Sequence, residues 1–401
     1  MSDPLMMSRA DVLRLGSAGL ASLLVPSSAS AATATRIARP AAHPTDDFQR
    51  LKQSMRGGLT LDYRVDDGSE LMRIGQWARA RGLLGDTYGR GAFIEKFERR
   101  MARMLGFEAA CFMPTGVMAL LSALRIFADR APTRAVGMHP SSHHLLHEED
   151  AYRIVHQLES AIISPWERQI LSEDVEEAPA LSSVSVEMPV RWIGGQLQSW
   201  EQLAALKAAA KSRGMKLVMD GARLWECQPY YDRSYAEICS GFDAVFVSFY
   251  KMIGGLNGAL LAADRDVIDE ALIWRRRLGG DVYQFFPYVL SAAMRIDDVL
   301  PRIGGYTRQA AKLFRQLTAH PEIAGLPSVP PTNLFRLILP GDRPSLMAKR
   351  DQIARETGIW VGDSFRPTRV PGLAQVELQI GPFLQALEPD EAAAAFFKLV
   401  D

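Results

Sequence analysis

The chain has 401 residues, a length that favours one large domain with a smaller companion over a single core. Its 46 basic and 46 acidic residues cancel, so we expect neither a nucleic acid nor an anionic membrane as a partner, and no apolar run is long enough to span a bilayer. Three cysteines without a CxxC spacing indicate neither a disulfide framework nor a zinc site.

Residues 1–45 have the pattern of an export signal. A basic stretch, Ser8–Arg14, precedes a short apolar stretch, Leu15–Val25, and small residues follow at 30–32. This leader is similar to a twin-arginine signal in which Ala10 replaces the second arginine. Two interpretations therefore stay open. The protein is periplasmic if the leader works, and it is cytoplasmic with a disordered leader if it does not.

A strand and a helix follow a polar, glycine-rich segment, 46–90, that we expect to form an N-terminal arm. The apolar strand 109–113 runs through Pro-Thr-Gly into the apolar helix 116–128. The first turn of a helix presents free N–H groups and the positive end of the helix dipole, which suits it to phosphate. We therefore expect Thr115, Gly116 and Val117 to hold a phosphate group.

Strands and helices alternate from about 109 to 262. Further strands are expected at 134–138 and 184–187, and a further helix at 200–213. This alternation predicts an α/β fold with a mostly parallel sheet, in which functional groups gather at the carboxyl ends of the strands.

Two of the predicted strands end in groups that carry chemistry. The strand 217–219 leads into Asp220, with Arg223 just past the turn. The β-branched and aromatic run 243–249 predicts a strand buried on both faces, and Lys251 follows it before a glycine-rich loop. Desolvation there lets the lysine lose its charge and form a Schiff base. A phosphate cradle, a buried carboxylate and an amine fit one cofactor, pyridoxal phosphate.

A histidine-rich segment lies at 143–149, with two glutamates. The pair His143 and His147 lacks the glutamate placement and the third ligand of an HExxH site, so we expect no metal. A surface histidine cluster and a site residue both stay open as interpretations of His143.

Three motifs, in this order and spacing, resemble the threonine aldolase/aromatic amino acid β-eliminating lyase family. They are P-T-G at 114–116, M-D-G-A-R at 219–223 and K-M-I-G-G-L-N-G at 251–258. The likeness runs from about residue 85 to residue 284. It implies the fold type I architecture of pyridoxal-phosphate enzymes.

The resemblance divides the chain into a large cofactor-binding domain, 91–300, and a small C-terminal α/β domain, 301–401. Strands in the small domain are expected at 332–339 and 374–380.

The resemblance also implies roles for single residues. Lys251 would carry the cofactor's aldehyde, Asp220 would pair with the pyridine nitrogen, and Arg223 would bind the phenolic oxygen or the substrate carboxylate. His143 matches a histidine that stacks on the pyridine ring. Tyr88, in G-D-T-Y-G, matches a tyrosine near the cofactor and substrate, with a packing residue as the alternative.

Several positions depart from the family pattern. Val117 replaces the usual second phosphate-binding threonine, and Val190 stands where the family has a candidate catalytic histidine. The strand 374–379 offers no arginine for the substrate carboxylate, and an arginine after Gly280 is also missing. Either the substrate differs or other residues fill in, and the candidates are His144, Arg191, Tyr250 and Tyr283.

The leading hypothesis is a pyridoxal-phosphate-dependent lyase that cleaves a β-hydroxy amino acid in an aldol-type reaction. β-Elimination, racemisation and transamination stay open within the cofactor class, and a degenerate fold type I protein without catalysis is the alternative from another class. The resemblance implies a homodimer or homotetramer, because fold type I sites lie where two subunits meet. We expect Trp274–Arg277 at that interface, with Arg276 near the neighbour's cofactor.

Overall fold

The computed structural model of the chain describes residues 46–63 and 66–401. The expected leader, 1–45, lies outside the described residues, and its export role stays a prediction. Residues 46–401 form one compact unit. Within the described part of the chain, no helix is both long enough and apolar enough to cross a membrane.

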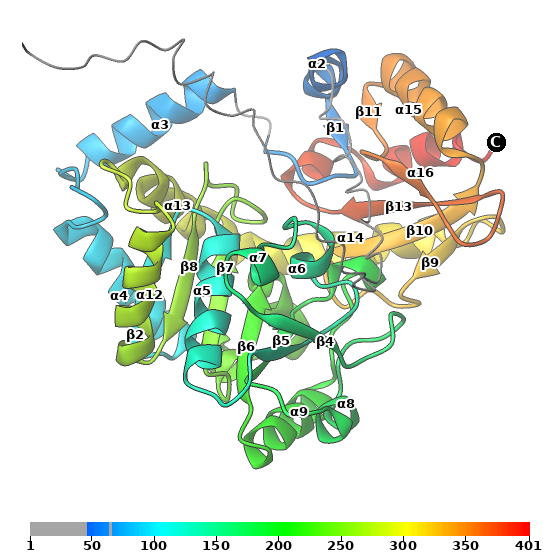
Figure 1. Cartoon of the computed structure of the whole chain (residues 1–401). Coiled ribbons are helices and arrows are strands. Elements are labelled where there is room, and N and C mark those ends of the chain that lie inside the picture. The colour runs from blue at the N-terminus through cyan, green and yellow to red at the C-terminus, as the bar shows by residue number, and fades with distance from the viewer. Residues whose placement is uncertain (1–45, 64–65) are drawn as a thin grey trace, which may run out of the picture. The chain divides into compact units, whose positions relative to one another are not determined.

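The architecture is built on a seven-stranded sheet of order β2-β8-β7-β6-β5-β3-β4 (Figure 1). β8 runs antiparallel to both of its neighbours, and the pairs from β7 to β4 are parallel. The strands are β2 (Ala109–Met113), β3 (Ala135–Met138), β4 (Glu159–Ile162), β5 (Ser183–Glu187), β6 (Lys216–Gly221), β7 (Ala244–Ser248) and β8 (Ala259–Ala263). The predicted α/β fold with a mostly parallel sheet is confirmed.

Helices cover both faces of this sheet because its central strands are apolar on both sides. In β7, Ala244 and Phe246 pack into the core beneath α5 and α12, while Val245 and Val247 face the core beneath α4, α9 and α13. Figure 1 shows α5 and α12 side by side. The covering helices are α4 (Ala92–Leu105), α5 (Gly116–Asp129), α9 (Trp200–Ser212), α12 (Arg265–Arg277) and α13 (Phe286–Val299).

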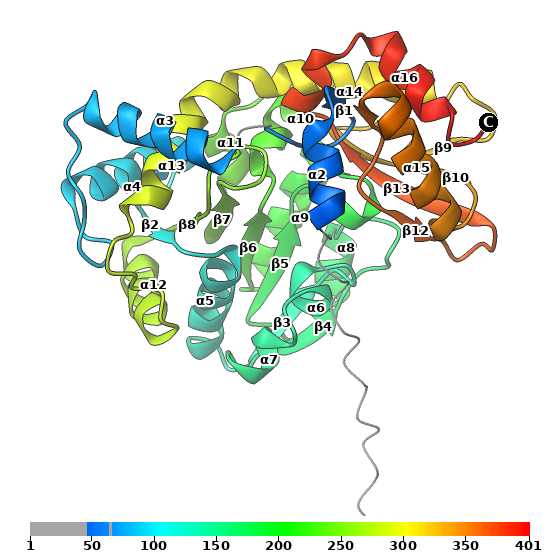
Figure 2. The same cartoon turned by 90° about the horizontal axis from the view of Figure 1, so that it is seen from above.

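A second, four-stranded antiparallel sheet of order β12-β13-β10-β9 follows in the chain. Figure 2 shows α15 and α16 beside it. Along β13, Val376 and Leu378 face its apolar core, so Gln375, Glu377 and Gln379 line the opposite face. The elements are α14 (Ile303–Leu317), β9 (Ala324–Leu326), β10 (Leu334–Pro340), α15 (Arg343–Thr357), β11 (Ile359–Trp360), β12 (Phe365–Pro367), β13 (Leu373–Gln379) and α16 (Pro389–Phe397).

The segment expected to form an arm contains α2 (Asp46–Ser54), β1 (Gly57–Gly58) and α3 (Asp67–Arg79). β1 pairs in parallel with β11, and Leu59 is buried in the core of the second sheet. This segment therefore ties the beginning of the described chain to its C-terminal elements. The short helices that complete the fold are α6 (His143–Leu146), α7 (Ala151–Ile154), α8 (Ser172–Glu177), α10 (Gln228–Tyr231) and α11 (Tyr235–Cys239), with 3-10 turns at Arg191–Ile193, Leu224–Cys227, Leu300–Arg302 and Pro382–Ala386.

Candidate active site

The carboxyl ends of the parallel strands bring the predicted site residues to one edge of the large sheet. Asp220 lies at the end of β6, where its register partners are Glu187 of β5 and Phe246 of β7. Lys251 follows β7, and Gly116 packs against the Phe246 ring. Gly116 and Lys251 are more than 130 residues apart in the sequence, and the pairing of the strands brings them to the same edge of the sheet.

Lys251 is half-buried at this edge. Burial, helped by the Arg223 charge and opposed by Asp220 and Glu187, lowers the pKa of its amine to about 8. A sizeable neutral fraction therefore exists near neutral pH. A neutral amine is the form that attacks an aldehyde.

The loop that carries Lys251 is fixed from several sides. The N–H of Gly255 donates to Phe249 O at 2.7 Å, and the N–H of Leu256 donates to Ser291 Oγ at 2.9 Å. The Tyr63 hydroxyl donates to Met252 O. Gly254 has a φ of +71°, and a side chain there would also collide with the Tyr63 ring, so glycine is required.

Two carboxyl groups sit side by side at the ends of β5 and β6. Asp220 is buried and its Oδ1 accepts from Ala222 N at 3.1 Å. Burial and then the Asp220 charge raise the pKa of Glu187 to about 7. Glu187 Oε1 accepts from Arg191 N at 3.1 Å, whereas its buried Oε2 has no hydrogen-bond partner among the described residues.

Arg223 and Glu226 add further unpaired polar atoms beneath this edge. Both side chains are buried, and within residues 46–63 and 66–401 neither Arg223 Nε nor Glu226 Oε2 has a partner. Burial raises the pKa of Glu226 to about 8, against the Arg223 charge. Buried polar groups in folded proteins are normally hydrogen-bonded, so this concentration of unpaired atoms fits a site built for a polar ligand.

The start of α5 has the geometry of a phosphate site. Thr115 is the exposed N-cap residue, and its Oγ1 accepts from Met118 N at 3.2 Å. The N–H groups of Gly116 and Val117 lie in the first turn, where a helix offers no acceptor. A Cβ at position 116 would lie 2.5 Å from Phe246 Cζ, so glycine permits this close approach to the sheet.

The two adjacent histidines differ in environment. His143 is half-buried and its Nδ1 lies 2.8 Å from Glu148 Oε1; His144 is fully buried and its Nδ1 lies 3.1 Å from Glu148 Oε2. Burial lowers the pKa of His144, but the Glu148, Asp220 and Glu187 charges raise it by more. His144 Nε2 has no partner in the described part of the chain. His144, rather than His143, is thus the histidine enclosed beside the strand-end carboxylates.

Tyr88 lies by a different hollow. Its ring meets that of Tyr283 edge to face at 5.3 Å, and its N–H donates to Tyr283 O at 2.9 Å. Both tyrosines are exposed. The adjacent cavity of about 650 Å³ is lined by Thr87, Tyr88, Arg90, Arg276 and Asp281. None of the strand-end groups described above lines this hollow.

Asp281 partly neutralises the run of three arginines, Arg275–Arg277, at the end of α12. Arg275 is buried and donates to Asp281 Oδ1 at 2.9 Å and to Phe112 O at 2.9 Å. The exposed Arg276 donates to the other oxygen of Asp281 at 3.0 Å. Asp281 thus offsets the charges of two of the three arginines, and the expected interface at Trp274–Arg277 stays a prediction.

A charged triad that the sequence did not predict joins the second sheet to the site. Glu377 of β13 pairs with Arg191 (Nη2–Oε1 2.8 Å) and with the buried Arg336 of β10 (Nη2–Oε2 2.7 Å). Two residues further along β13, Gln379 Nε2 donates to Glu226 Oε1 at 3.1 Å. The sequence contained one indication of this triad. An arginine within the apolar strand 334–339 requires a buried carboxylate partner.

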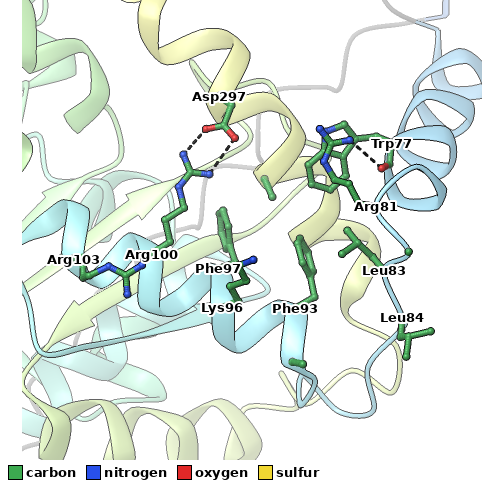
Figure 3. Close-up of a pocket in the computed structure, with 14 residues that line it drawn as sticks. Trp77, Arg81, Leu83, Leu84, Phe93, Lys96, Phe97, Arg100, Arg103 and Asp297 are labelled. Atoms are coloured by element: carbon green, nitrogen blue, oxygen red, sulfur yellow. Dashed lines mark hydrogen bonds and ion pairs between the residues drawn. The ribbon is translucent and has the colours of Figure 1, made fainter.

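The chain has another large hollow of about 860 Å³, between α3, α4 and α13 (Figure 3). Its lining includes Trp77, Phe93 and Phe97, together with Arg81 and Arg100. It contains none of the strand-end groups described above, so the chemistry belongs at the carboxyl edge of the sheet.

A doubly covered α/β sheet with a lysine, a carboxylate and a helix N-terminus at its carboxyl edge defines the fold type I class of pyridoxal-phosphate enzymes. Residues 62–335 match the family model described as beta-eliminating lyase, and the chain belongs to that family. It is a pyridoxal-phosphate-dependent lyase, as the sequence predicted, and the unpaired polar atoms at the site fit that cofactor.

Proteins of known structure are similar over nearly the whole described chain. A Listeria monocytogenes protein assigned as an L-allo-threonine aldolase is 33% identical, with a TM-score of 0.83, covering 88% of this chain and 97% of that one. An Exiguobacterium protein assigned as an aromatic amino acid beta-eliminating lyase/threonine aldolase is 33% identical, with a TM-score of 0.82, covering 87% and 98%. The low specificity L-threonine aldolase of Escherichia coli K12 is 27% identical over 235 residues, 56% of this chain and 69% of that protein.

Proposed function

We propose that this chain cleaves the Cα–Cβ bond of a β-hydroxy amino acid in an aldol-type reaction. The observation that carries the proposal is the meeting of Lys251, Asp220 and the start of α5 at one sheet edge. The names of the similar aldolases support the substrate class. Racemisation and β-elimination each appear in the name of a similar protein, but aldolases recur among the relatives, so these two reactions and transamination are not favoured.

The residues at the edge would divide the binding of the cofactor among them. The amides of Gly116 and Val117, with the Thr115 hydroxyl, would bind the phosphate; Asp220 would pair with the pyridine nitrogen. The Lys251 amine would hold the aldehyde. When bound, pyridoxal phosphate supplies an electron sink for negative charge at Cα.

Three more side chains from the sequence analysis keep their proposed roles. His143 is half-buried and anchored by Glu148, so it would cover the ring. Arg223 would use its unpaired Nε for the phenolic oxygen or for the substrate carboxylate. Tyr88, which lines the exposed hollow and contacts the Tyr283 ring, would serve substrate binding.

Two buried groups are placed to hold the proton that leaves the β-hydroxyl. Glu187 has a pKa raised to about 7 and keeps Oε2 without a partner, and His144 keeps Nε2 without a partner among the described residues. A general base works best when its pKa lies near the operating pH. Val190, where the family has a candidate catalytic histidine, can take no proton, so this work would fall to the two buried groups.

The test is product analysis with the cofactor-loaded protein. Threonine and allo-threonine should yield glycine and acetaldehyde in equal amounts. Ammonia and a keto acid would indicate elimination, and loss of optical activity without cleavage would indicate racemisation. A loaded protein that releases no aldehyde from any β-hydroxy amino acid would overturn the proposal.

We also infer a homodimer or homotetramer. The inference rests on the family resemblance and on the exposed aromatic pair Tyr88 and Tyr283 beside Arg276, whose side chain is 70% exposed. Exposed aromatics next to arginine are typical of interface hot spots. A neighbouring subunit placed there would bring its own cofactor region close to Arg276.

A further inference from the structure

Three arginines surround one tryptophan beside the proposed active site. The guanidinium carbons of Arg336, Arg366 and Arg191 lie 4.5, 4.6 and 5.9 Å from the ring centre of Trp192. Arg191 comes from the turn after β5, Arg336 from β10 and Arg366 from β12. We call Arg191, Arg336 and Arg366 the arginine cluster.

Among the described residues, Glu377 is the carboxylate that forms ion pairs with this cluster. Glu377 pairs with Arg191 and Arg336, whereas Arg366 forms no ion pair within residues 46–63 and 66–401. Arg336 is only 2% exposed, yet its Nε has no hydrogen-bond partner in the described chain. Three cations and one anion leave an excess of two positive charges, with a buried donor unused.

This excess of positive charge contributes to the lowered pKa values of neighbouring groups. Burial first, and then the charges of His143, Arg191 and Arg366, lower the pKa of His147 to about 4. Burial also lowers the pKa of Arg366, and Arg191 adds to the effect. His147 stacks on Trp192 with ring centres 5.7 Å apart, so the field extends over the face of that tryptophan.

The cluster is continuous with the catalytic edge. Arg191 N donates to Glu187 Oε1 at 3.1 Å, and Glu187 is the register partner of Asp220. The Arg191 charge contributes to the lowered pKa of Lys251. A molecule held at Lys251 therefore has the cluster within electrostatic reach.

We propose that the arginine cluster binds a second anionic group of the substrate, so that the enzyme prefers β-hydroxy amino acids with an acidic side chain. This inference rests on the proposed function. The α-carboxylate of an ordinary amino acid neutralises one positive charge. An acidic side chain neutralises the other and provides an acceptor for the unused donors of Arg336 and Arg366.

Aldol cleavage of such a substrate is balanced in atoms and electrons. The Cα–Cβ bond breaks, the β-hydroxyl loses its proton as the carbon becomes an aldehyde, and Cα gains a proton. For 3-hydroxyaspartate the products are glycine and glyoxylate. No oxidant or reductant is needed.

The test separates binding from cleavage. Aspartate and alanine differ in the acidic group and lack the β-hydroxyl that aldol cleavage needs, so titration of the loaded protein by its visible spectrum measures binding by itself. We expect aspartate to bind about tenfold more tightly than alanine at low salt, and we expect about 0.5 M NaCl to reduce the ratio. Arg366→Gln should lower the ratio to about threefold or less.

The control is Arg369→Gln, which removes another exposed arginine in the turn after β12 and should leave the ratio unchanged. Arg366 is exposed, so its substitution is expected to leave the fold intact. Equal binding of aspartate and alanine by the native protein, or a ratio that survives Arg366→Gln, would overturn the inference.

Turnover then tests the two proposals separately. 3-Hydroxyaspartate should be cleaved with a kcat/KM about tenfold above that of threonine. Tight aspartate binding without cleavage of either substrate would support the cluster and contradict the aldol function. Cleavage of threonine with no preference for acidic ligands would support the function and contradict the cluster.

Discussion

Glu187 and Asp220 are register partners at the ends of two parallel strands, and the charge of Asp220 helps to raise the pKa of Glu187. Two adjacent carboxylates cannot both ionise freely in a buried place. Glu187 is therefore a carboxyl that exchanges a proton near neutral pH, beside the aspartate proposed to pair with the pyridine nitrogen.

Lys251→Ala should abolish the visible absorption of the loaded protein, and borohydride reduction followed by peptide mapping should label Lys251 in the native chain. Lys207 is a demanding control, because burial lowers its pKa to about 8 as well. Lys207 donates to Ile238 O at 2.9 Å on the α9 side, away from the strand ends. Lys207→Ala should keep the absorption band, and a label on Lys207 would contradict the assignment.

Asp220→Asn should leave the fold intact and reduce kcat by roughly 100-fold or more, since a charge that stabilises the transition state is worth about that much. Circular dichroism and steady-state kinetics on the same preparation check both parts. Asp243→Asn, which removes an aspartate paired with Lys216 at 2.7 Å at the opposite end of the strands, is the matched control and should keep its turnover. Unchanged turnover in Asp220→Asn would show that Asp220 does not support the cofactor as an electron sink.

The rate at which the cofactor-free chain takes up pyridoxal phosphate should rise with pH with a midpoint near 8, because that is where half of the Lys251 amine has lost its proton. An unperturbed lysine would give a midpoint above about pH 10. Arg223→Gln removes a charge that lowers this pKa and should move the midpoint to higher pH. Stopped-flow absorbance across this range measures the profile, and a native midpoint at the ordinary lysine pKa would count against the buried amine.

Glu377→Gln should lower the free energy of unfolding at neutral pH by about 3 kcal/mol, since it leaves the buried Arg336 without its ion-pair partner. Burial alone would raise the pKa of Glu377, but the charges of Arg191 and Arg336 lower it to about 2. A carboxyl with a depressed pKa stabilises the fold above its ordinary pKa of about 4.5 and loses this contribution as the pH falls towards 2.

The difference in stability between native chain and variant should therefore shrink as the pH drops from about 5 to about 3. Urea unfolding at several pH values measures it. Glu391→Gln, which removes an exposed partner of Arg56, should change stability little at any pH. A difference that stays constant over this acidic range would show that the ion pairs do not act as described.

The assembly state is open to direct measurement. Light scattering or sedimentation of the loaded protein at micromolar concentration should give the mass of a dimer or a tetramer. Tyr88→Ser with Tyr283→Ser removes the exposed aromatic pair and should weaken the association. An active, loaded monomer would end the idea of a shared site.

Local patterns in the amino-acid sequence were enough to mark the proposed cofactor-binding groups. Thr115 to Val117, Asp220 and Lys251 each stand at or just after the end of an apolar strand, and a strand followed by a turn is a signal contained in about ten consecutive residues. Parallel pairing then gathers strand ends at one edge whatever the details of the loops. The fold class and the residues of the proposed cofactor site could therefore be predicted from the sequence.

The pairing of the buried charges, in contrast, became visible only in three dimensions. Glu377 meets Arg191 across a separation of 186 positions and faces Arg336 across the β10–β13 ladder. No periodicity in the sequence encodes such a pairing, because a buried guanidinium needs a carboxylate somewhere in space and not at a fixed spacing along the chain. The same holds for Arg275, which turns inward to Asp281 and Phe112 where the sequence showed only a run of three arginines.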